Sequence, residues 1–365
     1  MMHWRAGTVT EEVRRGPGSV ELAVDLEGTG ERVRALAYTA LTGAPEAGER
    51  VLLNASALLR GLGTGGLAFV VARGDVLPAD PPAGPGHIVK ARYTPLQQML
   101  LAVDEQESPH HDVLAGADDL GGMPVVVADL HSALPAVLAG IRAVRPDATV
   151  AYVMTDGGAL PAAFSRAVAG LREAGWLASC LTVGQAYGGD HEAVTVHTGL
   201  LAARHVVGAD VAVVAQGPGN VGTGTRWGYS GVAAVEALHA ADVLGGRPVA
   251  ALRVSGADRR DRHLGISHHS LTAYGRALYA PAEVPVTTLP DPALDARVRE
   301  QLARLVGTAR ARLTPVEVPA DGLAEALATS PVGLSTMGRG LAEDPAPFLV
   351  AAAAGSHAGS VSARP

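Results

Sequence analysis

Cysteine is almost absent from this chain of 365 residues, and its scarcity excludes several kinds of site. Cys180 is the single cysteine, so the sequence supports neither an intrachain disulfide nor a thiolate-rich zinc or iron–sulfur site. The residues on both sides of Cys180 are typical of a strand interior, where a thiol is buried and unreactive.

Aromatic residues, positive charge and long hydrophobic runs are also scarce. Aromatics make up 4% of the chain, too few for a platform on which nucleic-acid bases stack. The formal net charge of −7 argues against nucleic acid or an anionic membrane as the main partner. Although 48% of the residues are hydrophobic, no run approaches the roughly 20 apolar residues of a membrane span. The first residues lack the pattern of a secretory signal, so we expect a cytoplasmic protein.

Lysine is the rarest charged residue. Of the 29 lysines and arginines, Lys90 is the single lysine. A composition biased toward arginine explains this count without any special role for Lys90. The alternative is a functional ammonium group, because a guanidinium cannot replace it where space or proton transfer matters. Lys90 is therefore a candidate catalytic residue.

The first part of the chain predicts a small domain followed by a linker. Residues 1–76 contain short alternating strands and glycine-rich turns, which are typical of a small antiparallel β-barrel. Residues 61–66 match the dinucleotide-binding fingerprint, but a strand-like segment follows them, so a glycine turn is the better interpretation. Residues 77–88 hold four prolines and predict a linker.

Residues 89–350 predict an α/β domain. Apolar strands alternate there with helical stretches, a pattern typical of a doubly wound, mainly parallel sheet with helices on both faces. The expected strands are 125–128, 150–154, 180–183, 211–215, 249–254, 284–289 and 316–318. The expected helices are 133–144, 161–174, 195–207, 231–244 and 295–306. The low-complexity residues 351–365 predict a flexible tail.

Polar and glycine residues follow most of the expected strands. They occur at 129–131, 155–158, 184–190, 216–220 and 255–258. In an open parallel sheet the ligand crevice lies beyond the carboxyl ends of the strands. Turns need glycine and aspartate in any case, but recurrence along one edge favours a ligand site there.

The loop after strand 211–215 is the strongest candidate for one wall of that site. Its glycines allow close approach of a ligand, and its amide, hydroxyl and guanidinium groups can hold phosphate, carboxylate or sugar hydroxyls. The Walker A motif is absent from this loop, because no Gly-Lys-Ser/Thr follows the glycines, so a nucleoside triphosphate is not implied. The predicted ligand-binding residues are Gln216, Gly217, Gly219, Asn220, Thr223, Thr225 and Arg226, with Asp156 from another strand end and Arg339 from a late charged loop.

Two histidine-bearing segments supply the other candidates. Residues 104–112 combine acids and imidazoles, and Glu107, His110 and His111 can act as general bases or bind a divalent metal. The alternative is a solvated acidic loop that leads into a helix. In residues 262–276, His268 is a candidate catalytic residue. Adjacent helical side chains point about 100° apart, so His268 and its neighbour are not expected to chelate one ion together.

Four segments carry a family resemblance. They are KARYTPLQ at 90–97, DEQESPHH at 104–111, AQGPGN at 215–220 and STMGRG at 335–340. With them, most of the chain resembles the bacterial domain-of-unknown-function family 3866. The resemblance implies no activity, cofactor or catalytic residue, so the function has to be argued from the residues.

Three functions fit these observations. The first is an enzyme, either a transferase or a hydrolase, that acts on a small anionic or phosphorylated metabolite. Redox chemistry is disfavoured because no true dinucleotide fingerprint is present. The second is a non-catalytic metabolite sensor that uses the same crevice. The third is a metal-dependent hydrolase built on residues 104–112. The cofactor, any bound metal and a homo-oligomeric state are left open.

Overall fold

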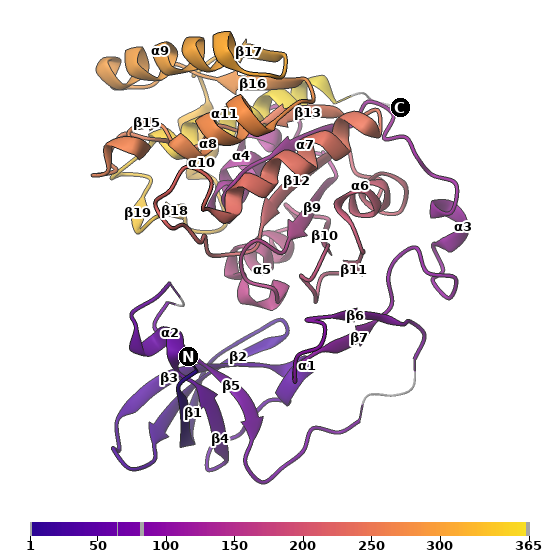
Figure 1. Ribbon diagram of the computed structural model, residues 1–365, viewed down its shortest axis with the longest axis vertical. Helices are drawn as coiled ribbons and strands as arrows, with labels where there is room; N and C mark the ends of the chain where they lie inside the picture. The colour runs from indigo at the N-terminus through magenta and orange to yellow at the C-terminus, as the bar shows by residue number, and fades with distance from the viewer. Residues whose placement is uncertain (1, 64, 81–83, 363–365) are drawn as a thin grey trace. The chain divides into compact units, whose positions relative to one another are not determined.

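The computed structural model describes residues 2–63, 65–80 and 84–362. The chain divides into two compact units, Met1–Gly84 and Pro85–Pro365 (Figure 1). The division falls within the segment 77–88 that predicts a linker. Among the described residues, no helix has both the length and the apolar character that crossing a membrane requires.

The first unit is a closed five-stranded barrel in the order β1-β2-β3-β5-β4, with β4 paired back to β1. The β3–β5 pair is parallel and the others are antiparallel. The predicted small barrel is confirmed, but it is mixed, because β4 inserts between β5 and β1. The strands are β1 (Trp4–Gly16), β2 (Ser19–Leu26), β3 (Arg32–Tyr38), β4 (Arg50–Asn54) and β5 (Leu67–Arg73).

Two short helices complete this unit, α1 (Thr39–Thr42) and α2 (Ser56–Leu59). The glycines at 61, 65 and 66 adopt positive φ between α2 and β5. No helix follows them, so the turn interpretation of 61–66 is confirmed for the described residues of that segment. Apolar side chains from all five strands fill the barrel, among them Val9, Leu22, Ala35, Leu53 and Val70.

The second unit is built on an eight-stranded parallel sheet, ordered β11-β10-β9-β12-β8-β13-β16-β17. The predicted parallel α/β architecture is confirmed. Cys180 lies inside β10, and burial raises the pKa of its thiol to about 12, as the strand-interior interpretation requires. The strands are β8 (Pro124–Val127), β9 (Val150–Thr155), β10 (Ser179–Thr182), β11 (His191–Glu192), β12 (Val211–Gln216), β13 (Arg247–Ala250), β16 (Ala282–Val286) and β17 (Leu313–Glu317).

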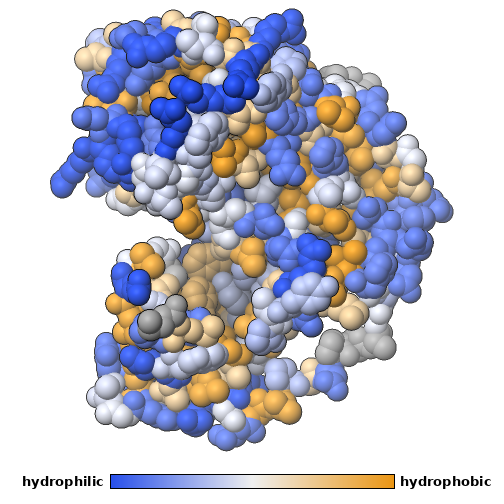
Figure 2. All heavy atoms as spheres, in the orientation of Figure 1, coloured by the Kyte–Doolittle hydropathy of each residue, from blue (hydrophilic) through white to orange (hydrophobic). Residues whose placement is uncertain are grey.

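Helices cover both faces of the sheet, which is why the central strands are apolar on both sides. One layer holds α4 (Leu134–Val144), α5 (Arg166–Glu173), α10 (Leu323–Ala328) and α11 (Ala346–Val361). The other holds α6 (Val196–His205), α7 (Ala234–Val243), α8 (His268–Thr272) with the π-helical turn η5 (Ala273–Ala277), and α9 (Pro292–Thr308). On the face drawn in Figure 2, hydrophilic and hydrophobic residues are interspersed over the surface.

The flexible tail predicted from residue 351 is wrong as far as Val361. These residues belong to α11, most of whose side chains are buried. Its alanines and glycines resemble low complexity in sequence, but small residues let α11 pack directly on α4. A Cβ on Gly355 would lie 1.9 Å from the carbonyl oxygen of Val137, and one on Gly140 would lie 1.9 Å from that of Ala352. The composition of this segment therefore gave no sign that it forms a buried helix packed on α4.

Candidate functional site

β8 and β13 are neighbouring strands, and the segments that follow them cross to opposite faces of the sheet. After β8 the chain crosses to α4 and goes on to β9. After β13 it passes through β14 (Val254–Ser255) and β15 (Gly265–Ile266) to α8, on the other face, and goes on to β16. Such a topological switch point opens a crevice beyond the carboxyl ends of the two strands.

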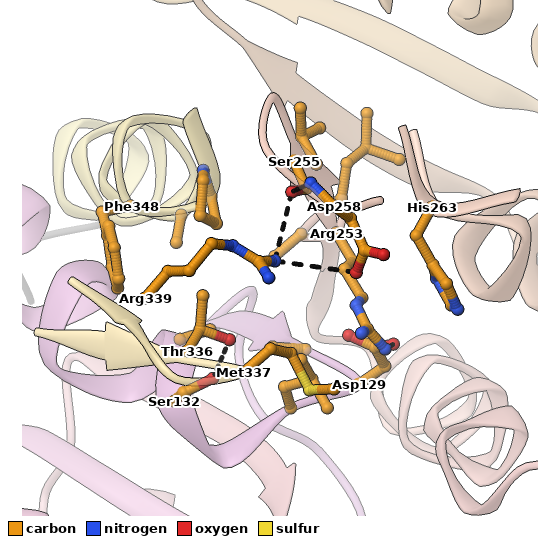
Figure 3. Close-up of a pocket in the computed structure, with 18 residues that line it drawn as sticks. Asp129, Ser132, Arg253, Ser255, Asp258, His263, Thr336, Met337, Arg339 and Phe348 are labelled. Atoms are coloured by element: carbon orange, nitrogen blue, oxygen red, sulfur yellow. Dashed lines mark hydrogen bonds and ion pairs between the residues drawn. The ribbon is translucent and has the colours of Figure 1, made fainter. Parts of the chain in front are cut away.

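A cavity occupies this switch point (Figure 3). The empty space between its walls, counted out into open solvent, is about 540 Å³, of which about 40 Å³ can hold the centre of a water molecule. Four segments line it: the loop after β8, the loop after β13, the hairpin of β18 (Ser335–Thr336) and β19 (Arg339–Gly340), and the first turns of α11. We call it the switch-point cavity. Its polar side chains are Asp129, Ser132, Arg253, Ser255, Asp258, His263, Thr336 and Arg339.

Asp129 lies at the carboxyl end of β8 and is buried with one oxygen unsatisfied. Its Oδ2 atom has no hydrogen-bond partner; Arg253 Nη1 lies 3.7 Å from it and His269 Nδ1 lies 3.5 Å from it. Asp129 also lines a second, smaller hollow between the ends of β8 and β12. There Gln216 Oε1 is likewise buried without a partner. Two free acceptors therefore face the sheet edge.

Arg339 extends across the switch-point cavity from β19 (Figure 3). Its Nη2 atom lies 3.4 Å from Ser255 Oγ and 3.6 Å from Asp258 Oδ2, and its Nε atom lies 3.4 Å from Asp344 Oδ2. These separations exceed those of good hydrogen bonds. Asp258 has a better partner in Arg260, at 2.8 Å, which holds the pKa of that carboxyl well below its usual range. The guanidinium of Arg339 is thus only loosely held.

Three histidines gather beside the cavity. The ring centroid of His268 lies 4.8 Å from that of His263 and 4.4 Å from that of His269. Tyr229 stacks on His269 with ring centroids 3.8 Å apart. Burial, together with Arg253 and nearby charges, lowers the pKa of His263 to about 3. Burial and His269 lower the pKa of His268 to about 4. Both imidazoles are neutral at pH 7.

A buried hydrogen-bond chain fixes the loop after β8. His131 Nδ1 lies 2.9 Å from Tyr152 Oη, and its Nε2 lies 2.7 Å from Ser165 Oγ. Tyr152 donates to the carbonyl oxygens at the end of β12, and Ser165 caps α5. Every side-chain polar atom of His131, Tyr152 and Ser165 has a partner. These hydrogen bonds therefore position the neighbouring loop that carries Asp129.

His131 predicts a pH dependence of stability. Burial lowers its pKa from 6.5 to about 4. Above pH 6.5 the residue is neutral in both the folded and unfolded states, and the stabilisation is complete. Between pH 6.5 and pH 4 only the unfolded state binds the proton. The free energy of unfolding therefore decreases as the pH is lowered, by about 1 kcal/mol at pH 5.5. Urea unfolding from pH 7.5 to 5.5 measures this slope, and His131→Gln should flatten it; an unchanged slope in the variant contradicts the assignment.

The loop after β12 is organised mainly by its own contacts. A Cβ on Gly217 would lie 2.2 Å from the carbonyl oxygen of Ala159, and one on Gly158 would lie 2.1 Å from that of Gly217. These glycines serve close packing of the loops after β9 and β12. Among the other predicted ligand-binding residues, Asn220 Oδ1 accepts hydrogen bonds from Gln216 and Ser230, the hydroxyls of Thr223 and Thr225 hydrogen-bond to each other, and Asp156 accepts from Gln185 N. Arg226 is exposed, and Gly219 has a positive φ.

Lys90 has a structural environment. It is fully buried, and its Nζ atom donates to the carbonyl oxygens of Thr182 (2.9 Å), Ala186 (2.8 Å) and Ala193 (3.0 Å). Its ion pair with Glu192 Oε2 spans 3.0 Å. These contacts engage all the donors of the ammonium group. The structure therefore offers no support for the catalytic role predicted for Lys90.

Glu107, His110 and His111 lie near β11, the edge strand on the other side of β8 from β13. Their segment runs beside β11, where Val103 N donates to Glu192 O. β11 is separated from β8 by four strand spacings, roughly 19 Å, so these residues and Asp129 do not share a cavity. Their contacts are local: Gly86 N with Glu107 Oε2 at 3.0 Å, Asp104 O with His111 Nδ1 at 2.8 Å, and the rings of His110 and His191 with centroids 5.5 Å apart.

Of the predicted site residues, the structure places Arg339 in the switch-point cavity, Gln216 in the adjoining hollow and His268 beside them. Sequence reasoning did not select Asp129 and Arg253. Asp129 stands at a strand end that the sequence marked as polar, whereas Arg253 falls in an expected strand and carries no local signal.

A known protein family matches most of this chain. The family model described as "Protein of unknown function (DUF3866)" matches residues 34–355. No curated protein matches the chain.

Proposed function

The chain belongs to the DUF3866 family of proteins of unknown function, and we propose that it is a hydrolase or transferase acting on a small anionic or phosphorylated metabolite in the switch-point cavity. The observation that carries this proposal is the buried, unpartnered Oδ2 atom of Asp129. A buried acceptor without a partner costs about 1–3 kcal/mol. A hydroxyl group of a substrate, or a water held by it, supplies that partner.

The loosely held guanidinium of Arg339 supports the anionic character of the ligand. Its three neighbours lie at 3.4–3.6 Å, so little is lost when it turns toward a phosphate or carboxylate. The first turn of α11 also lines the cavity through Pro347 and Phe348. The partial positive charge of that helix terminus favours an anion in the same space.

In this proposal each side chain has a different task. Asp129 is placed to accept a proton from the attacking hydroxyl or water, as a general base does. Arg339 is placed to offset negative charge that develops on the substrate. Gln216, next to Asp129 in the adjoining hollow, has its Oε1 free to orient a ligand donor. The remaining residues of the loop after β12 are not needed in this scheme.

Thermal-shift screening with phosphorylated and carboxylated metabolites tests the proposal. Arg339→Ala is expected to weaken binding of the best ligand at least tenfold, since a charge-assisted contact is worth roughly 1.5–3 kcal/mol. Arg297→Ala on α9, which removes the same charge from an exposed position, is the matched control and should bind as the wild type does.

The role of Asp129 is tested by turnover of the ligand that the screen identifies. Asp129→Asn keeps the shape of the side chain but removes the base, so kcat should fall by roughly 10²–10⁴-fold. Binding without turnover in the wild type would instead favour the metabolite sensor. If Arg339→Ala and Asp129→Asn both leave the ligand response unchanged, the cavity is not the site.

A further inference from the structure

His263, His268 and His269 converge beside the switch-point cavity, and we propose that they bind a divalent transition metal ion, best matched by zinc. One imidazole nitrogen of each lies within 4.8 Å of those of the other two. The nitrogen ligands of a tetrahedral zinc ion lie roughly 3.3 Å apart, with bonds of roughly 2.0–2.1 Å. A contraction of about 1.5 Å at the widest pair, within reach of side-chain rotation, closes the site.

The local fold explains how two adjacent histidines face a third. His263 ends the 3₁₀ turn η4 (Asp261–His263), and the chain passes through β15 before α8 begins at His268. Ser267 caps α8 by accepting from His269 N at 3.2 Å. Tyr229 holds the ring of His269 by stacking. Although adjacent helical side chains point about 100° apart, the ring centroids of His268 and His269 lie 4.8 Å and 5.1 Å from that of His263.

The protonation states suit metal ligands. His263 Nδ1 lies 2.8 Å from Ser267 Oγ, and its Nε2 lies 3.4 Å from the Nε–H of Arg262. This places the proton of His263 on Nδ1 and a lone pair on Nε2.

Asp129 provides an independent indication. Its side chain is 8% exposed, and its unpartnered Oδ2 lies 3.5 Å from His269 Nδ1. Histidines that bind metals commonly donate their second nitrogen to a carboxylate, which fixes the ring and raises its basicity. With Nδ1–H directed to Asp129, Nε2 of His269 carries the lone pair for the ion. In the metal-bound protein Asp129 is then a positioning residue for the metal, in place of the general-base role that the proposed function gives it.

In this structure Arg253 donates to Nδ1 of His269, so metal binding requires this arginine to move. Its Nη1 lies 3.0 Å from His269 Nδ1 and 3.7 Å from Asp129 Oδ2. When Nδ1 carries the proton, Arg253 can no longer donate to it and moves onto the carboxylate. The positive charges of Arg253 and Arg260 are offset by Asp129 and Asp258, while Arg262 is exposed and free to turn away.

Three imidazoles leave a fourth position for water, as in catalytic zinc sites. His263 lines the switch-point cavity, so a metal-bound water lies at its border, where zinc lowers the pKa of that water toward 7. Participation of the ion in the reaction rests on the proposed function. Binding of the ion does not, and it is measured without any substrate.

The test uses the full chain, stripped with a chelator and reloaded with one equivalent of zinc sulfate. After desalting, elemental analysis should find about one zinc per chain, and calorimetry should give the affinity. Cobalt chloride in place of zinc should produce the intense visible absorption of a tetrahedral site. His263→Ala and His268→Gln should each weaken zinc binding at least 100-fold. Asp129→Asn should weaken it roughly 10–100-fold.

His197→Ala on α6 is the matched control, since it removes one histidine outside the cluster. It should bind zinc as the wild type does. Circular dichroism establishes that each variant is folded, and His268→Gln, at a half-buried position, is the mildest change. Less than a tenth of an equivalent retained by the wild type, or equal affinity in the cluster variants and in His197→Ala, overturns the metal site. Absence of turnover in a wild-type protein that binds zinc normally would count against the proposed function alone.

Discussion

Replacement of Lys90 by methionine is expected to lower the free energy of unfolding by about 3–5 kcal/mol, the usual cost of removing one member of a buried ion pair. Methionine fills a similar volume but donates nothing. The carbonyl oxygens of Thr182, Ala186 and Ala193 would lose the donor that they share, and Glu192 would lose its countercharge. Urea denaturation of the variant and the wild type at pH 7 measures the difference.

The double variant Lys90→Met/Glu192→Gln separates charge from hydrogen bonding. Removing both charges should recover part of the loss, because an isolated buried carboxylate is the most costly element. Lys90→Arg should stay destabilised, since the planar guanidinium cannot donate to three carbonyls around one nitrogen. A wild-type midpoint for Lys90→Met contradicts the structural role and reopens the catalytic one.

Substitution of Gly355 by alanine should cost about 3 kcal/mol, at the upper end of the usual cost of overpacking. The added Cβ meets the backbone of α4 at the carbonyl of Val137, and a backbone cannot rotate away as a side chain can. Gly140→Ala meets the carbonyl of Ala352 in the reciprocal contact and should behave alike. The two helices would have to separate. Thermal and urea unfolding of both variants measure the effect.

Gly307→Ala is the matched control for these substitutions. Gly307 lies in the last turn of α9, and a Cβ there meets nothing within 4 Å. Alanine is a better helix former than glycine, so this variant should gain up to about 1 kcal/mol. Opposite signs for Gly307→Ala and Gly355→Ala identify a packing effect. Stabilisation by both would mean that α4 and α11 do not cross at these glycines.

Much of the fold was predictable because its signals are local. The apolar strands and the helices between them specify a parallel α/β sheet, and the short alternating strands specify a barrel. The sequence also pointed to the sheet edge at which we propose the site, since polar residues follow the strands there. Arg339, predicted as a ligand-binding residue, lines the switch-point cavity, and His268, predicted as a catalytic residue, lies beside it.

The differences between the sequence-based expectations and the structure have a common physical origin in tertiary packing. Residues 351–361 have the composition of a tail, yet the same small residues allow α11 to lie against α4. Lys90 is rare in the sequence, but its solvation by carbonyl oxygens from a distant loop makes it structural. In the loop after β12, Gly217 serves packing against the loop after β9. Each residue type was noted, and only its surroundings decided the role.

By itself, the sequence determined the periodic patterns, and with them the two kinds of domain and the polar edge of the sheet. Only the tertiary structure decided that β8 and β13 are neighbours, so that Asp129 meets Arg253 and the histidines of α8. Strand periodicity reflects the burial of nearby side chains. Strand order instead depends on how helices far apart in the chain pack over the sheet, and that free energy leaves no local trace in the sequence.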